Sequence, residues 1–350
     1  MQQQGYGQRP QLQQYWPQAN IAPAPKKKNT LGVVLLAVIV VVLIGAFGIV
    51  SSHFVSSASN PVTPPTTPSA GPTTTSGPNS TPVSRPPSVA VPDPEFDPPD
   101  LPVPASLNEA IQWLQQNALY SQSAARNDCA VGTIDIARAS TAQLEAHFYD
   151  LSSCLWQVWN PPLTEAGFQL PRMPITVYDK PITSACGEAP MQNAFYCGAD
   201  QRIFYAKDFY TVVPRELIGK PFVADSIIAH EFGHGIQART GVLYARIIYK
   251  NQLDDESEEL ELSRRHEMQA DCLAGVFSRS VAAANSLSAD ELYALAEVIY
   301  SVGDDQLTGD ETYVSDHGTG NARNRWFIEG VNSYDVGVCN TYIADSSLVR

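Results

Sequence analysis

The hydrophobic positions of this chain form patterns of different period, and each period predicts a different kind of element. Residues 31–50 are twenty consecutive residues without a charge. At about 1.5 Å per residue, a helix of that length spans the ~30 Å hydrocarbon core of a bilayer, so we expect a transmembrane helix there. Apolar residues at helical spacing then run from Ser106 to Leu119 and from Ser140 to Val158. Since serine is a favoured N-cap residue, both stretches predict packed helices.

Further along the chain, short β-prone runs and longer helical runs follow one another. The β-prone runs occupy residues 175–178, 194–196 and 203–205. Because the turn-forming residues 198–201 separate the last two runs, we expect a β-hairpin there. Helical patterns return at residues 222–240, which end at Gly241, and at about 254–280 and 288–300. The folded part of the chain is therefore predicted to be α+β, with helices dominating.

Composition divides the chain into four parts. Residues 1–30 are rich in Gln and Pro and contain no acidic residue, which predicts a disordered tail. The predicted membrane helix at residues 31–50 follows. Residues 51–104 are mainly Ser, Thr, Pro and Gly with few charges, a composition typical of an extended stalk. Residues 105–350 are long enough to build a core and are predicted to form the folded domain.

Basic residues set the expected orientation in the membrane. Arg9 and the lysines at 26–28 precede the apolar run, whereas only Arg85 occurs within the fifty residues after it. The positive-inside rule then places the N-terminus in the cytoplasm and the folded domain outside the cell membrane. A cleaved signal peptide is the alternative, and the Ser-Ser-Ala sequence at 56–58 would permit cleavage. We favour the anchor because the apolar run is longer than the apolar region of a usual signal peptide and follows a thirty-residue tail.

Charge and cysteine content narrow the class of protein. The formal net charge of −14 is opposite to the basic surface that nucleic-acid binding requires. The sequence has neither a phosphate-binding glycine loop nor a G-x-S-x-G motif, so phosphoryl transfer and serine hydrolase chemistry lack support. All six cysteines lie in the predicted extracytoplasmic domain without a C-x-x-C pair, which predicts three disulfides. Of the fifteen connectivities that six cysteines allow, we favour Cys186–Cys197, which closes a short loop, with Cys129–Cys154 and Cys272–Cys339.

The strongest chemical signal is the H-E-x-x-H sequence from His230 to His234, which lies within the helix predicted at residues 222–240. Residues four apart on a helix lie about 40° apart in projection, so the two imidazoles can share one Zn²⁺. Glu231 lies about 100° around the helix, where its carboxylate can take a proton from a zinc-activated water without binding the metal. The alternative is a surface helix with unrelated imidazoles. Apolar residues surround the motif, however, and buried His and Glu side chains are costly without partners.

A catalytic zinc site needs a third protein ligand and an open position for water. The helix predicted at about 254–280 supplies Glu267 and Asp271, which are four residues apart and share a face. We expect Glu267 to bind the metal and Asp271 to accept the free N–H of a zinc-bound histidine; the reverse assignment is the main alternative. His266 projects about 100° away from Glu267 into a charged stretch, so we expect it to be solvated.

These residues resemble the bacterial neutral zinc metallopeptidase family over residues 175–330. The resemblance rests on NAFYC at 193–197, residues 203–205, HEFGHGIQ at 230–237, EMQADCLAG at 267–275, and His317-Gly318-Thr319 leading to Arg325-Trp326-Phe327. It implies a zincin fold, in which the active-site helix packs under a small sheet and an acidic residue of the following helix is the third zinc ligand. Two positions depart from the family pattern: Gly235 replaces a histidine, and Gly320 stands where the last motif ends in serine. Neither is a proposed ligand.

The predicted function is a membrane-anchored, extracytoplasmic zinc peptidase with Glu231 as the general base. We expect a peptide substrate to lie extended along the strand near residues 193–196. His317, in a polar loop, is the candidate for stabilising the oxyanion, with Tyr313 and Tyr205 as alternatives. Two other functions stay open: an extracytoplasmic binding or scaffold domain with a structural or vestigial metal site, and hydrolysis of a non-peptide amide. Structural zinc sites usually have four protein ligands, which favours the enzyme.

Overall fold

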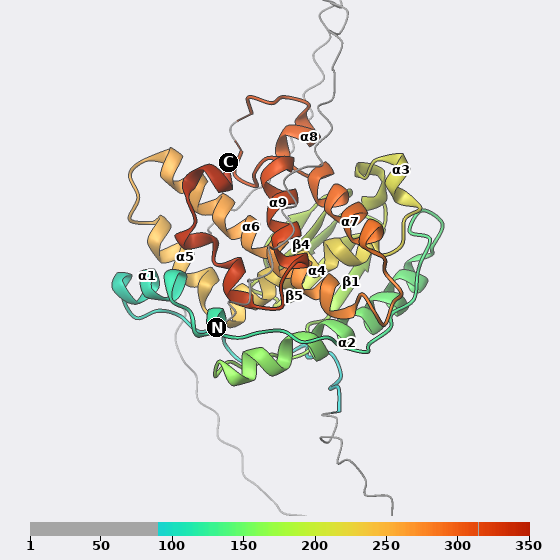
Figure 1. Cartoon of the computed structure of the whole chain (residues 1–350), viewed down its shortest axis with the longest axis horizontal. Helices are drawn as coiled ribbons and strands as arrows, with labels where there is room; N and C mark the ends of the chain where they lie inside the picture. The colour runs from blue at the N-terminus through green and yellow to red at the C-terminus, as the bar shows by residue number, and fades with distance from the viewer. Residues whose placement is uncertain (1–89, 314) are drawn as a thin grey trace, which may run out of the picture. The chain divides into compact units, whose positions relative to one another are not determined.

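The computed structural model describes residues 90–313 and 315–350 (Figure 1). The predicted tail, membrane helix and most of the stalk lie outside the described residues. Within these two ranges, no helix is both long and apolar enough to cross a membrane. Helices dominate and accompany a small sheet, as predicted for an α+β domain. The helices are α1 (Leu107–Gln115), α2 (Thr141–Glu165), α3 (Arg215–Ile218), α4 (Val223–Arg239), α5 (Val242–Lys250), α6 (Glu256–Val281), α7 (Ala289–Ser301), α8 (Asp304–Thr308) and α9 (Gly320–Val331). The strands are β1 (Ile175–Tyr178), β2 (Ile182–Ser184), β3 (Gly187–Ala189), β4 (Ala194–Cys197) and β5 (Arg202–Ala206).

Helices α1 and α2 begin at the serine caps that the sequence predicts, and α7 begins at a further serine cap. Ser106 precedes α1 and accepts a hydrogen bond from the first turn. Ser140 and Ser288 begin α2 and α7 with complete capping boxes. The first helix is shorter than predicted and ends at Gln115, because the side chain of Asn117 caps a separate 3-10 turn, η1 (Ala118–Ser121). Local capping chemistry therefore sets these boundaries.

The three-stranded sheet has the order β1-β5-β4, with β1 parallel and β4 antiparallel to β5. The predicted β4–β5 hairpin is confirmed, whereas the ribbon of β2 with β3 was not predicted. Ala206 N donates to Asn193 O, and bonded pairs alternate along an antiparallel ladder. Ala194 and Tyr196 therefore turn their main-chain N–H and C=O groups toward the free edge of β4.

Helix α4 lies at the centre of the domain (Figure 1). It contacts β4 and β5 of the sheet and the helices α2, α5, α6 and α7. All its residues are buried except His234, which is partly exposed. A helix with no solvated face must find partners for its polar side chains inside the protein.

Helices α6 and α9 cross closely at two glycines. A Cβ at Gly275 would lie 2.1 Å from Phe327 O, and a Cβ at Gly330 would lie 2.0 Å from Cys272 O. No side chain tolerates separations this short, so the crossing requires glycine at both positions. The contact holds α9 against the turn of α6 that carries Asp271.

All three predicted disulfides are confirmed: Cys129–Cys154, Cys186–Cys197 and Cys272–Cys339. The first joins the loop before α2 to that helix. The second joins the β2–β3 turn to the end of β4, and the third joins α6 to the 3-10 turn η3 (Val336–Cys339). Edge strand β4 and helix α6, which both contact α4, are thereby cross-linked to other parts of the domain. Disulfides of this kind are typical of proteins outside the cytoplasm.

Residues 90–104, the described end of the predicted stalk, lie against the folded part of the chain. Glu95 N donates to Arg172 O at 2.8 Å, and Arg172 Nη1 donates to Pro92 O at 3.1 Å. Arg239, the last residue of α4, donates to Pro99 O at 2.8 Å. This segment therefore contacts the helix that carries the H-E-x-x-H sequence.

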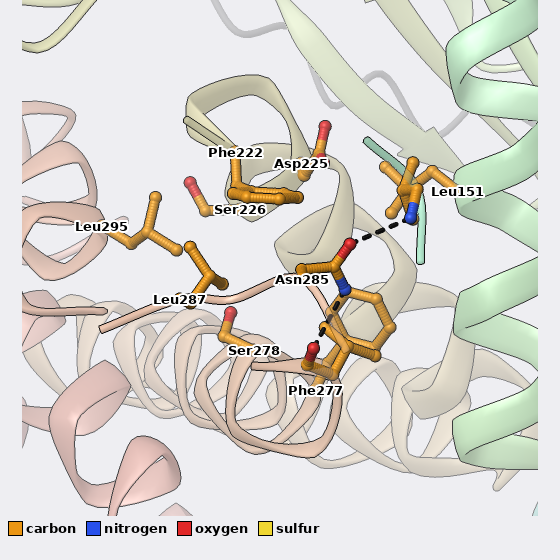
Figure 2. A pocket seen from close by; sticks show the side chains of 11 residues that line it. Leu151, Phe222, Asp225, Ser226, Phe277, Ser278, Asn285, Leu287 and Leu295 are labelled. Atoms are coloured by element: carbon orange, nitrogen blue, oxygen red, sulfur yellow. Dashed lines mark hydrogen bonds between the residues drawn. The ribbon is translucent and has the colours of Figure 1, made fainter. Parts of the chain in front are cut away.

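A small cavity lies beside the N-terminal end of α4, lined mainly by apolar side chains of α2, α6, α7 and the loops between helices (Figure 2). Asn285 borders it: its side-chain oxygen accepts from Val131 N, and its amide nitrogen donates to Cys129 O, both at 3.0 Å. None of the predicted site residues lines this cavity, so it is separate from the candidate metal centre.

A buried ion pair joins α2 to α4. His147 Nε2 lies 2.7 Å from Asp225 Oδ1, and the two side chains are 8% and 6% exposed. Burial opposes the charged imidazole, but the hydrogen bond and charge of Asp225 outweigh it and raise the pKa of His147. A histidine with a raised folded pKa stabilises the fold below its unfolded pKa of about 6.5, and this stabilisation is lost as pH rises through the folded pKa.

We therefore predict that His147→Gln lowers the free energy of unfolding more on the acid side than on the alkaline side. Urea denaturation of both proteins measures the difference, which should shrink as the pH rises from about 6.5 through the raised pKa of His147. Comparing wild type with the variant at each pH cancels the titration of other groups. A difference that stays constant across this range would mean that His147 carries no charge in the folded protein.

We also predict that Gly330→Ala lowers the free energy of unfolding by about 1–3 kcal/mol, because the added methyl group meets the Cys272 carbonyl. Gly219→Ala is the control, since no atom lies within 4 Å of a Cβ at Gly219 and its φ is −85°. Thermal or urea denaturation measures both variants. Equal stability of the two would contradict a tight α6–α9 crossing.

Candidate metal centre

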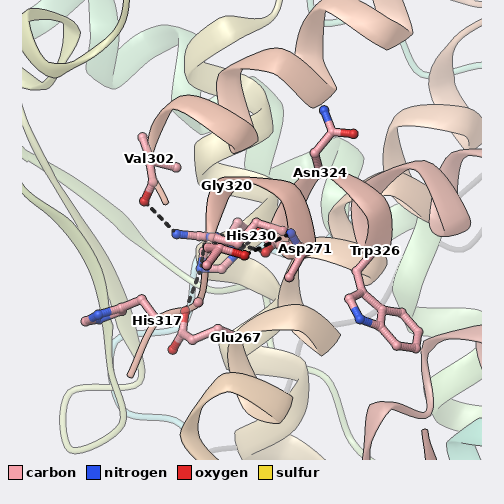
Figure 3. Close-up of polar contacts among 12 residues, drawn as sticks. His230, Glu267, Asp271, Val302, His317, Gly320, Asn324 and Trp326 are labelled. Atoms are coloured by element: carbon pink, nitrogen blue, oxygen red, sulfur yellow. Dashed lines mark hydrogen bonds and ion pairs between the residues drawn. The ribbon is translucent and has the colours of Figure 1, made fainter. Parts of the chain in front are cut away.

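The two histidines of the H-E-x-x-H sequence lie one turn apart on the same face of α4, with ring centroids 4.7 Å apart. Glu267 reaches them from α6: its Oε2 lies 3.3 Å from His230 Nε2 and 3.4 Å from His234 Nε2. One ligand atom from each of the three side chains lies within 4.8 Å of the others. Two helices thus bring together the three residues that the sequence predicts as metal ligands (Figure 3 shows His230 with Glu267).

Each histidine uses its other ring nitrogen for a hydrogen bond within the domain. Asp271 Oδ1 lies 2.8 Å from His230 Nδ1, and Gln237 Oε1 lies 2.7 Å from His234 Nδ1. Both partners are acceptors, so each neutral ring carries its hydrogen on Nδ1 and leaves Nε2 free as a ligand. Glu267 therefore faces the two free nitrogens, and Asp271 lies behind His230.

Gln237 is a residue of the site that the sequence analysis did not predict. Its amide nitrogen donates to His266 O at 2.8 Å and to Gln269 Oε1 at 3.1 Å, which directs its amide oxygen at His234. Gln269 in turn donates to Tyr120 OH at 2.9 Å. Its spacing could have indicated this role, because Gln237 follows His234 by three residues and so shares its face of the helix.

Arg323, on α9, is a second residue of the site that the sequence analysis did not predict. Its guanidinium donates to both carboxylate oxygens of Asp271, at 2.9 Å and 3.0 Å. No local pattern singles it out, because Asp271 lies 52 residues away in the sequence.

The ionised carboxylate of Glu267 favours a bound cation. Burial opposes ionisation of Glu267, but the imidazoles of His234 and His230 outweigh it and hold the pKa of that carboxyl well below its usual range. Burial likewise opposes the charge on His230, whereas Asp271 raises its pKa to about 9, so a metal that binds this imidazole displaces a proton. Two imidazoles and one carboxylate are a donor set that binds zinc in catalytic sites with a fourth position for water. The residues therefore fit zinc.

Glu231 lies between the histidines and the sheet. Its Oε2 accepts a hydrogen bond from Tyr196 N at 2.9 Å, and the residue is 7% exposed. Burial raises the pKa of Glu231, which makes its carboxylate a stronger proton acceptor. The predicted base therefore lies where α4 meets the free edge of β4.

His317 lies in the loop between α8 and α9. The next residue, Gly318, has a φ of +99°, and a Cβ there would lie 1.9 Å from Met268 Cε. Only glycine combines this conformation with so close an approach. The loop thus packs on the residue that follows Glu267, and His317 lies beside the ligand set.

The His317 ring contacts two carboxylates. Its Nδ1 lies 2.9 Å from Asp316 Oδ1 and 3.5 Å from Asp304 Oδ2. Burial opposes the imidazolium, but these contacts outweigh it and raise the pKa of His317 to about 11. In Figure 3 the ring points away from Glu267. His317 is therefore a cation next to the ligand set, and its role toward an oxyanion stays a prediction.

The two alternatives to His317 lie in different surroundings. Tyr205 is 1% exposed and packs in the core against Phe148, with ring centroids 5.0 Å apart. Tyr313 is 49% exposed and lies in the same loop as His317. Of these two tyrosines, Tyr313 is therefore the one that an outside molecule can reach.

The expectation that His266 is solvated is wrong. It is 4% exposed, stacks on the His234 ring with centroids 5.1 Å apart, and places Nδ1 3.0 Å from Tyr342 OH. Helical projection placed it away from Glu267 on an open face. The C-terminal turn η4 (Thr341–Ile343) covers that face of α6, a contact that no helical period reveals.

Comparison with known proteins assigns the family. The model of a family described as "Putative neutral zinc metallopeptidase" matches residues 117–342, so the chain belongs to that family. "Uncharacterized protein YpfJ" of Escherichia coli (strain K12) is 29% identical over 191 residues, which cover 53% of this chain and 66% of the relative, just under two thirds. "Uncharacterized protein Rv2575" of Mycobacterium tuberculosis (strain ATCC 25618 / H37Rv) is 29% identical over 208 residues, which cover 53% and 67%. No solved structure matches the chain.

We predict about one zinc per wild-type chain and little in Glu267→Ala, because two imidazoles alone leave the site one ligand short. Elemental analysis of the purified proteins measures the metal. Glu258→Ala, which removes an exposed carboxylate from the same helix, is the control and should keep its zinc. Absence of zinc from the wild type, even after reconstitution, would favour a binding domain with a vestigial site.

Proposed function

We propose that the protein is a zinc-dependent peptidase. The observation that carries this proposal is the convergence of His230 Nε2, His234 Nε2 and Glu267 Oε2 within 4.8 Å, with Glu231 beside them. Membership of the zinc metallopeptidase family supports it. The described part of the chain offers three ligands here, and all six cysteines are in disulfides, which favours a catalytic over a structural metal.

In the proposed reaction, His230, His234 and Glu267 hold the metal. When bound there, zinc supplies Lewis acidity that polarises a scissile carbonyl and acidifies a water. The Glu231 carboxylate takes a proton from the attacking water and delivers it to the leaving amine nitrogen. Burial, which raises its pKa, helps Glu231 to hold that proton between the two transfers.

The proposed substrate is an extended peptide that pairs with β4. The free edge offers the main-chain groups of Ala194 and the carbonyl of Tyr196, next to Glu231. Peptides add to such an edge through main-chain hydrogen bonds, which give affinity without dependence on sequence. The same hydrogen bonding brings the peptide carbonyl near the metal ligands. For the oxyanion we propose His317, with Tyr313 as the alternative.

We further propose that residues 31–50 anchor the protein in the cell membrane, with residues 1–30 in the cytoplasm and the peptidase domain outside. The three disulfides support an oxidising location for that domain. The excess of lysine and arginine before residue 31 supports the orientation. The substrates would then be peptides or proteins outside the cytoplasm.

We predict that Glu231→Gln keeps its zinc but loses peptide hydrolysis by at least about 10²- to 10⁴-fold, because the amide cannot accept the proton of the water. Zinc content and the rate of cleavage of a mixed peptide library, read by mass spectrometry, test the two parts separately. Glu258→Gln makes the same chemical change on the exposed face of α6 and should keep full activity. Full hydrolysis by Glu231→Gln would overturn the role of Glu231.

A further inference from the structure

Arg323 is a buried arginine that contacts Asp271 and His230 of the metal centre. It belongs to the first turns of α9 and is 5% exposed. Nε donates to Asp271 Oδ2 at 2.9 Å, Nη2 donates to Asp271 Oδ1 at 3.0 Å, and Nη1 donates to Val302 O at 3.1 Å. All three guanidinium nitrogens are therefore committed to fixed acceptors.

We propose that Arg323 is a positioning residue of the metal centre: it orients Asp271, which in turn directs His230 Nε2 at the metal. The inference rests on the proposed zinc site. Asp271 Oδ1 is shared, because it accepts from Arg323 Nη2 and lies 2.8 Å from His230 Nδ1. A two-point contact fixes the plane of the carboxylate, and this plane decides where the imidazole N–H must point.

The guanidinium also limits the tilt of the ring. Arg323 Nη2 lies 3.4 Å from His230 Nδ1 and 3.5 Å from His230 Nε2, so it packs on the ring and not only on Asp271. In Figure 3, His230 lies close to Asp271 and Glu267. Because Asp271 is fully buried, removing the guanidinium takes away a charged partner that bulk solvent does not reach in the wild type.

A purely structural role is the competing explanation, since Arg323 also ties α9 to α6. Arg279 provides a matched control: its Nη1 donates to Val331 O at 3.1 Å, and its guanidinium lies 4.5 Å from the Tyr334 ring centroid. It therefore links the same two helices with the same group and contacts none of the metal ligands. Arg323→Lys is the conservative variant because it keeps the positive charge. Lysine cannot reproduce the two-point contact, so this variant tests that contact alone.

The test measures zinc affinity of the full-length protein by competition with a chelator, for wild type, Arg323→Lys, Arg323→Met and Arg279→Met. We expect both Arg323 variants to bind zinc about 10- to 100-fold more weakly, and Arg279→Met to melt at a lower temperature with wild-type zinc affinity. The visible spectrum of the Co²⁺-substituted protein should change in Arg323→Lys and stay unchanged in Arg279→Met. If Arg323→Met does not fold, Arg323→Lys decides the question.

Wild-type zinc affinity and an unchanged Co²⁺ spectrum in Arg323→Lys would overturn the proposal. An equal loss of zinc affinity in Arg279→Met would overturn it too, because the effect would then belong to the helix crossing. Failure of the proposed function gives a different result. A wild-type protein that binds zinc but cleaves no peptide would contradict the peptidase while leaving the role of Arg323 intact.

Discussion

The burial of α4 is the constraint on which the rest of the structure depends. This helix carries ionisable side chains and has no solvated face, so each of them must find a partner inside the protein. The partners are Asp271 for His230, Gln237 for His234 and the main chain of Tyr196 for Glu231. Burial therefore explains why the orientations of the His230 and His234 rings are defined. The hydrogen bond that satisfies Nδ1 of each buried ring also sets the direction of its Nε2 atom.

Most of these partners come from elements that are distant in the sequence, so the metal centre depends on how the helices cross. α6 supplies Glu267 and Asp271, and α9 supplies Arg323. The two helices can approach because Gly275 and Gly330 present no side chain at the crossing. The Cys272–Cys339 disulfide ties the same part of α6 to the C-terminal segment, which also covers His266.

The two histidines have different support. His230 is hydrogen-bonded to a carboxylate that is paired with a buried guanidinium. His234 is hydrogen-bonded to the neutral amide of Gln237, which is in turn bonded to the amide of Gln269. Charge is thus concentrated on the inner side of the site, while His234 lies at the partly exposed side. This asymmetry suits a centre that is closed toward the core and accessible at the side of His234.

The sequence by itself determined the features that follow local rules. Helical spacing put His230 with His234 and Glu267 with Asp271 on shared faces, serine caps marked two helix starts, and the cysteines paired as expected. Only the tertiary structure decided which side chains surround those faces. Arg323 and the cover over His266 come from segments dozens of residues away, and the short β2–β3 ribbon depends on contacts that its few residues do not encode. The physical reason is the distance along the sequence over which each effect acts. Capping and helical periodicity act within one or two turns of a helix, whereas the burial of a helix face depends on which distant segment packs against it.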